Sequence, residues 1–161
     1  MLASNNVYKK NHIMKEFVEK TVLIAHEAGN LINKIFLKNI RESSALEVQK
    51  KHDSSPVTIA DMASHKIIVN KLRRMKPLLP IVSEEDTGSY DFLKKSEKFW
   101  LIDPLDGTKE FLSKSAEYTV NIALVEQGKS VFGVVYAPAL DQMFFGIRDL
   151  GAFKKKNGLV N

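Results

Sequence analysis

The chain has 161 residues, of which 44% are hydrophobic and 27% are charged, a balance typical of one globular domain. It contains no cysteine, so disulfides and thiolate metal sites are excluded. No apolar run approaches about 20 residues, and the N-terminus lacks the apolar region of a signal peptide. We therefore expect a cytoplasmic protein without a transmembrane segment, with peripheral binding at the inner face of the membrane as the alternative location.

The net charge is +5, from 24 Lys and Arg residues against 19 Asp and Glu residues. The basic residues are scattered, apart from Arg73–Arg74 and Lys154–Lys156, which favours an ordinary solvated surface. Such a surface also attracts anionic phosphate esters. Because no motif combines aromatic and basic residues as nucleic-acid-binding domains do, we expect no nucleic acid partner.

A long amphipathic helix is predicted from His12 to Lys38, after a polar and loose segment from Met1 to Asn11. Its apolar residues recur every three or four positions and form one buried stripe, at Phe17, Ile24, Ala28, Leu31 and Ile35. The pair Ala28–Gly29 predicts close packing against another element. His26 is interpreted as a surface or packing residue, because no metal-binding partner lies at a suitable spacing.

A half-exposed strand is predicted from Leu46 to Lys51 and a polar turn from His52 to Pro56. A second helix then begins at Thr58, with Asp61 three positions later as its capping-box partner. This helix passes Leu72 and ends before Pro77. By this local reasoning, Asp61 caps a helix.

The second half of the chain is rich in short strands. A polar excursion covers 87–98, Gly133 indicates a bulge or a close approach, and turns are expected at Gln127–Lys129 and Pro138–Asp141. The predicted strands are Ile81–Val82, Phe99–Ile102, Tyr118–Val125, Val131–Tyr136, Gln142–Ile147 and Gly151–Lys154. We expect an α+β domain with two N-terminal helices packed on one face of a largely antiparallel sheet.

Two carboxylates follow the buried strand at Phe99–Ile102, in the segment Asp103-Pro-Leu-Asp-Gly-Thr108. Pro104 is expected to end the strand, so that the turn aims Asp103 and Asp106 at one point. Carboxylates so close repel each other unless a cation lies between them, and hard oxygen ligands favour Mg²⁺. An ordinary surface turn is the alternative interpretation.

The residues beside these carboxylates extend the possible site. Gly107 lets the backbone approach a ligand, and Thr108 is predicted to cap a short helix at Lys109–Leu112 whose N–H groups face an anion. Glu84, delivered by the strand at Ile81–Val82, is positioned to join Asp103 and Asp106 around one cation. Otherwise the acidic run Glu84–Asp86 is a solvated loop.

The segment Asp103–Thr108 resembles the metal-binding signature of the inositol monophosphatase superfamily, a group of Mg²⁺-dependent phosphomonoesterases. Further segments resemble this family in the same order, at Ser55–Asp61, Pro80–Asp86, Tyr118–Leu124 and Gly133–Pro138. The continuation Lys109-Glu110-Phe111 is similar to the CysQ-type 3'(2'),5'-bisphosphate nucleotidases. The resemblance implies the first half of the layered sugar-phosphatase fold and hydrolysis of adenosine 3',5'-bisphosphate to AMP and phosphate.

The same resemblance implies residue roles. It implies a Mg²⁺ site made by Glu84, Asp103, Asp106 and the carbonyl of Leu105. It implies that Glu84 and Thr108 orient or deprotonate the attacking water and that Asp61 hydrogen-bonds Thr108. The implied substrate-binding residues are Glu84, Leu105, Asp106, Gly107 and Thr108.

Family members continue into a second α/β domain, in which the aspartate of a Trp-Asp motif completes the metal site. The only tryptophan here is Trp100, so residues 1–161 are expected to form the N-terminal metal- and phosphate-binding domain without the C-terminal one. Alternatives are a non-catalytic fragment and an inositol monophosphatase-type sugar phosphatase. The expected partners are a phosphate ester and either a second copy or a chain supplying the missing domain.

Overall fold

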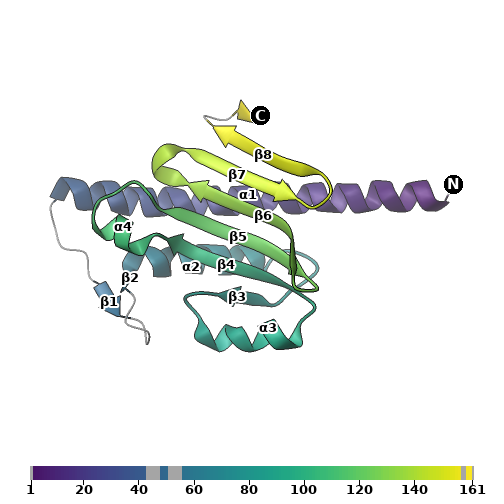
Figure 1. Ribbon diagram of the computed structural model, residues 1–161, viewed down its shortest axis with the longest axis horizontal. Coiled ribbons are helices and arrows are strands. Elements are labelled where there is room, and N and C mark those ends of the chain that lie inside the picture. The colour runs from purple at the N-terminus through teal and green to yellow at the C-terminus, as the bar shows by residue number, and fades with distance from the viewer. Residues whose placement is uncertain (1, 43–47, 51–55, 157–158, 161) are drawn as a thin grey trace.

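The computed structural model describes residues 2–42, 48–50, 56–156 and 159–160 of the chain. Two helices, α1 (Leu2–Glu42) and α2 (Ile59–Leu72), lie on the same side of a seven-stranded sheet (Figure 1). The predicted α+β class with both helices on one face is therefore confirmed. No helix within the described ranges is long and apolar enough to cross a bilayer.

Helix α1 is longer than the sequence predicts, since it begins at Leu2, and the prediction of a loose segment up to Asn11 is wrong. Adding a residue to an existing helix costs less free energy than nucleating a new one. A helix anchored by its buried stripe therefore extends into a polar segment. The predicted stripe is confirmed at Phe17, Ile24 and Ala28. Beyond Ala28, the buried apolar residues are Ile32 and Phe36, whereas Leu31 and Ile35 are only partly buried.

The packing of α1 against strand β6 (Lys129–Ala137) is as close as Ala28–Gly29 predicts. A Cβ atom on Gly29 would lie 2.5 Å from a ring carbon of Tyr136, so only glycine fits. His26 is exposed and packs on the same tyrosine, with ring centroids 5.4 Å apart, as expected of a packing residue.

Helix α2 begins with the predicted capping box. The Thr58 side chain accepts a hydrogen bond from the N–H of Ala60 at 3.1 Å, and the N–H of Thr58 donates to Asp61 at 2.7 Å. The helix ends at Leu72, before Pro77 as predicted. Ahead of it, β1 (Val48–Lys50) pairs antiparallel with β2 (Pro56–Thr58), so Pro56 belongs to a strand and not to the predicted turn. Residues 46, 47 and 51–55 of these predictions lie outside the described residues.

The main sheet is mixed. Its strand order is β3-β4-β5-β6-β7-β8-β9, and within the described strands only β3 and β4 are parallel. The strands other than β6 are β3 (Ile81–Ser83), β4 (Lys98–Asp106), β5 (Thr119–Glu126), β7 (Gln142–Ile147), β8 (Gly151–Lys156) and β9 (Leu159–Val160). Strand β9 was not predicted. The predicted, largely antiparallel arrangement of the sheet is confirmed.

Strand β4 continues through Pro104 to Asp106, so the prediction that Pro104 ends the strand is wrong. The register with β5 shifts between Asp103 and Asp106, which leaves the proline inside an irregularity of the ladder. A proline has no N–H to donate, and such an irregularity is where a sheet accommodates it.

Three smaller predictions meet mixed outcomes. The excursion at 87–98 contains the 3₁₀ turn η1 (Thr87–Tyr90) and the short helix α3 (Asp91–Lys95), which lies beside β3 (Figure 1). The hairpin turn is confirmed, with Gln127 and Gly128 at φ values of 51° and 72°. Gly133 marks neither a bulge nor a close approach, because it pairs in register and a Cβ atom added there would lie 3.9 Å from the nearest described atom.

Candidate active site

The predicted acidic residues meet where the parallel pairing of β3 with β4 ends, after Ser83 and Ile102. Glu84 directly follows β3, and its N–H donates to the carbonyl of Ile102 in β4 at 3.1 Å. Parallel neighbours present their carboxyl ends at the same edge of a sheet. This pairing therefore brings Glu84 next to Asp103.

Asp103 is held in an environment that opposes its negative charge. Burial, a side-chain hydrogen bond with Glu84, and the charges of Glu84, Asp106 and Glu85 raise the pKa of Asp103 from 3.8 to about 8. Its Oδ1 atom is buried and meets no hydrogen-bond partner among the described residues. A carboxylate pair with an unsatisfied buried oxygen is the donor chemistry that a hard divalent cation stabilises.

Asp106 lies at the edge of this pair. It is exposed and accepts a hydrogen bond from Asn121 Nδ2 at 3.2 Å, which turns it toward β5. Across the described ranges, no three His, Asp or Glu side chains converge closely enough to hold an ion by themselves. The three predicted carboxylates therefore do not converge equally. Glu84 and Asp103 form a close pair, and the charge of Asp106 acts on Asp103 from nearby. This donor set still fits Mg²⁺, which binds through one or two carboxylates and completes its shell with water and phosphate oxygens.

Thr108 connects this segment to α2. Its hydroxyl lies 3.1 Å from Asp61 Oδ1 and 3.2 Å from the carbonyl oxygen of Leu105, and it has one proton to donate. Asp61 is fully buried and also accepts from the N–H and the hydroxyl of Thr58. The same carboxylate therefore caps α2 and binds Thr108.

Thr108 does not cap the short helix, which corrects the sequence prediction. Helix α4 runs from Thr108 to Leu112, and its N-cap is Gly107 at a φ of 91°. A Cβ atom on Gly107 would lie 2.6 Å from the carbonyl oxygen of Glu117, so this position requires glycine for both backbone conformation and space. Phe111 anchors α4 in an aromatic cluster with Phe36 and Tyr118.

Sequence reasoning missed several residues that hold the site. Ser64, fully buried on α2, donates to the carbonyl of Pro104 at 2.8 Å, and Asn121 holds Asp106 from the next strand. His65, also on α2, bonds to Ser83 beside Glu84. The spacing of Asp61, Ser64 and His65 at i, i+3 and i+4 places all three on one helix face, and that polar stripe was the available signal.

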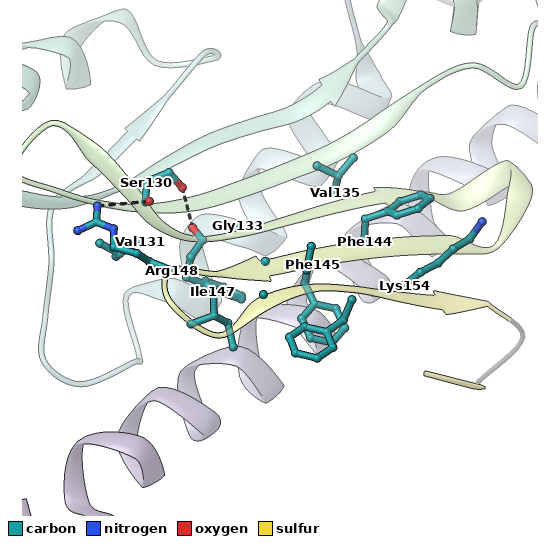
Figure 2. Close-up of a pocket in the computed structure, with 14 residues that line it drawn as sticks. Ser130, Val131, Gly133, Val135, Phe144, Phe145, Ile147, Arg148 and Lys154 are labelled. Atoms are coloured by element: carbon teal, nitrogen blue, oxygen red, sulfur yellow. Dashed lines mark hydrogen bonds between the residues drawn. The ribbon is translucent and has the colours of Figure 1, made fainter. Parts of the chain in front are cut away.

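The site opens on the face of the sheet opposite α1 and α2. A hollow of about 550 Å³ is lined there by Glu84, Asp103 and Asn121 together with apolar residues that include Leu101 and Val135. A larger hollow of about 670 Å³ lies over β6, β7 and β8, and no predicted site residue is among its described lining (Figure 2). The smaller hollow is the candidate site, because it contains the half-buried pair of Glu84 and Asp103.

The chain belongs to the inositol monophosphatase family, whose model matches residues 14–159. It is similar to the 3'(2'),5'-bisphosphate nucleotidase CysQ of Salmonella typhimurium, with 44% identity over 128 residues, which cover 80% of this chain and 50% of that protein. The CysQ of Escherichia coli strain K12 is 40% identical over 79% of this chain and 50% of its own length.

Solved structures agree with this assignment. The structure of CysQ from Bacteroides thetaiotaomicron has a TM-score of 0.72 and 34% identity, over 94% of this chain and 51% of that one. The extragenic suppressor protein suhB from Bartonella henselae has a TM-score of 0.75 and 32% identity, over 87% of this chain and 52% of that one. The chain thus spans about half the length of the curated relatives it matches.

Proposed function

We propose that residues 1–161 form the metal- and phosphate-binding domain of a Mg²⁺-dependent phosphomonoesterase. The observation that carries this proposal is the half-buried Asp103 carboxyl, which lies beside Glu84 and has a buried Oδ1 that is unsatisfied within the described structure. A carboxylate in that position destabilises the folded state unless a bound ligand offsets the cost of burying its charge. Membership of the inositol monophosphatase family supports the same reaction class.

The proposed metal ligands are Glu84, Asp103, Asp106 and the carbonyl of Leu105. When bound, Mg²⁺ supplies Lewis-acid polarisation of the phosphoryl group. The chain's own contribution is to hold these oxygens in place. Asn121 orients Asp106, Ser64 ties down the backbone at Pro104, and the parallel pairing holds Glu84 beside Asp103.

Water activation is assigned to Thr108, Asp61 and Glu84. Asp61 is the stronger acceptor for the Thr108 proton, since a carboxylate accepts more strongly than a carbonyl. Thr108 Oγ1 then has lone pairs free to accept a hydrogen bond from one O–H of the water, while Glu84 accepts from the other O–H. As the oriented water attacks phosphorus, Glu84 takes up one of its protons, the ester P–O bond breaks, and that proton is passed to the leaving oxygen. The N–H groups of Gly107 and Thr108 are the proposed binding groups for phosphate oxygens.

The proposed substrate is adenosine 3',5'-bisphosphate, which would yield AMP and phosphate. Support comes from the CysQ nucleotidases at 40–44% identity and from Lys109-Glu110-Phe111 after the signature. The proposed partner of the open sheet face is the half of the relatives' length that this chain does not span. Its exposed apolar residues and the adjoining hollow support that arrangement.

The test uses a chimera in which the remaining half of the Salmonella typhimurium relative follows this chain. We expect phosphate release with Mg²⁺, and a higher kcat/KM for adenosine 3',5'-bisphosphate than for inositol 1-phosphate. A chimera that prefers the inositol ester would instead be a sugar phosphatase of the inositol monophosphatase type. The 161-residue chain alone is expected to turn over far more slowly than about 1 s⁻¹, the lower end for ordinary enzymes.

A second candidate function is a non-catalytic module that binds metal or phosphate. The lack of any three-residue metal group across the described residues favours it. The chimera separates the two functions: a folded chimera that binds Mg²⁺ but releases no phosphate supports the non-catalytic module.

A further inference from the structure

Helix α2 contacts three segments of the site through one face. Asp61 bonds to Thr108, Ser64 bonds to the carbonyl of Pro104, and His65 Nδ1 lies 2.8 Å from Ser83 Oγ. The first two contacts hold the signature segment Asp103–Thr108, at the end of β4 and the start of α4. The third reaches β3, whose last residue directly precedes Glu84.

Strand β3 needs such an anchor, because it is short and poorly paired. It has three residues, lies at the edge of the described sheet, and pairs with β4 alone. Ser83 is its most highly connected residue: its N–H donates to Ser89 Oγ, and its Oγ accepts from the N–H of Glu85 at 3.3 Å. Ser83 therefore connects the strand to the turn that carries Glu84 and Glu85.

The contact between Ser83 and His65 indicates which ring nitrogen of His65 accepts a hydrogen bond. Ser83 is 1% exposed, and His65 Nδ1 lies 2.8 Å from its Oγ, within hydrogen-bond reach of its hydroxyl. A buried hydroxyl proton requires an acceptor. Ser83 therefore donates to His65 Nδ1, and a neutral ring with that arrangement carries its own proton on Nε2.

The burial of His65 favours a neutral ring. Burial lowers the pKa of His65; Asp86 opposes this change, and Arg73 and Lys66 add to it. At neutral pH, a neutral ring has one nitrogen available as an acceptor, and the contact with Ser83 assigns that role to Nδ1.

We propose that His65 is a positioning residue that acts through Ser83 to hold Glu84 beside Asp103, as a neutral imidazole protonated on Nε2. The inference rests on the proposed function, because Glu84 is a metal ligand only in that function. Residues that orient a ligand from behind typically change metal affinity by about 10–100-fold when mutated.

The test measures Mn²⁺ binding to the 161-residue chain by electron paramagnetic resonance. In His65→Asn, the amide oxygen can take the place of Nδ1, whereas His65→Leu keeps a similar volume without an acceptor. Ile68→Val, one turn along α2, is the control for general destabilisation. We expect His65→Asn and Ile68→Val to stay within about threefold of wild type, and His65→Leu to bind about tenfold more weakly.

Equal affinity in His65→Leu and wild type would overturn the inference, as would an equal loss in His65→Asn and His65→Leu. If wild type binds no Mn²⁺, the metal site of the proposed function fails, and the positioning role is decided by nuclear magnetic resonance. Nitrogen shifts showing a proton on Nε2, with faster exchange of the Glu85 amide in His65→Leu alone, would support it. A proton on Nδ1, or equal exchange in both His65 variants, would refute it.

Discussion

The two faces of the main sheet differ in what covers them. Toward α1 and α2, Trp100, Ile122 and Val134 are each 1% exposed. On the opposite face, Leu101, Val135 and Phe144 are each 42% exposed. Side chains alternate along a strand, so neighbouring residues of β4 belong to different environments.

The covered face therefore contributes mainly to stability, and the open face contains the candidate site. The helix-covered face contains most of the apolar core, and the open face contains Asp103 and the hollow beside Glu84. Strand β4 contributes to both, since Trp100 stacks on Phe17 of α1 while Asp103 lines the hollow. Substitutions on the two faces should therefore affect different measurements.

The largest expected effect is on the covered face. Trp100→Ala should destabilise the chain by about 3–5 kcal/mol, because it removes a large buried side chain and leaves a cavity. Leu101→Ala, one residue later on the open face, should cost less than about 1 kcal/mol, since that leucine already contacts water. Urea unfolding of both variants measures the difference; similar midpoints would show that the two faces are equally important for stability.

The next effect is at the junction between β4 and α4. Gly107→Ala should cost about 2 kcal/mol, because its Cβ meets the carbonyl oxygen of Glu117 in a left-handed backbone conformation. Gly128→Ala is the matched control: its φ is also positive, but its Cβ would meet no described atom within 4 Å. Thermal unfolding should show a smaller loss for Gly128→Ala, and equal losses would mean that backbone strain alone matters.

On the open face, Asp106→Asn should weaken Mg²⁺ binding about tenfold or more, roughly 1.4 kcal/mol, by removing a negative ligand. It should leave the urea midpoint nearly unchanged, because Asp106 is exposed. Asp91→Asn, an exposed carboxylate on α3, is the control. Titration calorimetry measures the Mg²⁺ affinity of wild type and both variants. Equal affinity in wild type and Asp106→Asn would remove Asp106 from the site.

A further difference between the two faces is a pH dependence caused by Asp103. Its pKa rises from 3.8 to about 8 on folding, so its favourable contribution to stability is complete below the lower value. That contribution falls as the pH rises and is lost above about 8 in the metal-free chain. Mg²⁺ should therefore displace a proton near pH 7 and bind more tightly as the pH approaches 8.

Calorimetry in buffers of different ionisation enthalpy measures that proton release. Asp103→Asn should abolish the release and make metal-free stability less dependent on pH between 4 and 8. Proton release that persists in Asp103→Asn would assign the titration to another group.

Much of the architecture follows from short-range signals. The capping box of Thr58 and Asp61, the stripe on α1 up to Ala28 and the turn at Gln127–Lys129 each depend on residues close in sequence. Hydrophobic periodicity and turn chemistry are local properties, so the sequence alone predicted them and the α+β class. The acidic segments after β3 and in the last part of β4 were identified in the same way.

Tertiary structure decided how those segments meet. The path of β4 through Pro104 depends on pairing with β5, and the cap of α4 depends on the space left by Glu117. Ser64 and Pro104 are 40 residues apart, and Asn121 reaches Asp106 from another strand. Such contacts depend on the register and crossing of elements distant in sequence, and a one-residue slip of a strand sends every side chain to the other face. The sequence therefore determined which carboxylates are available, and only the packing of α2, β3, β4 and β5 decided which of them became buried and paired.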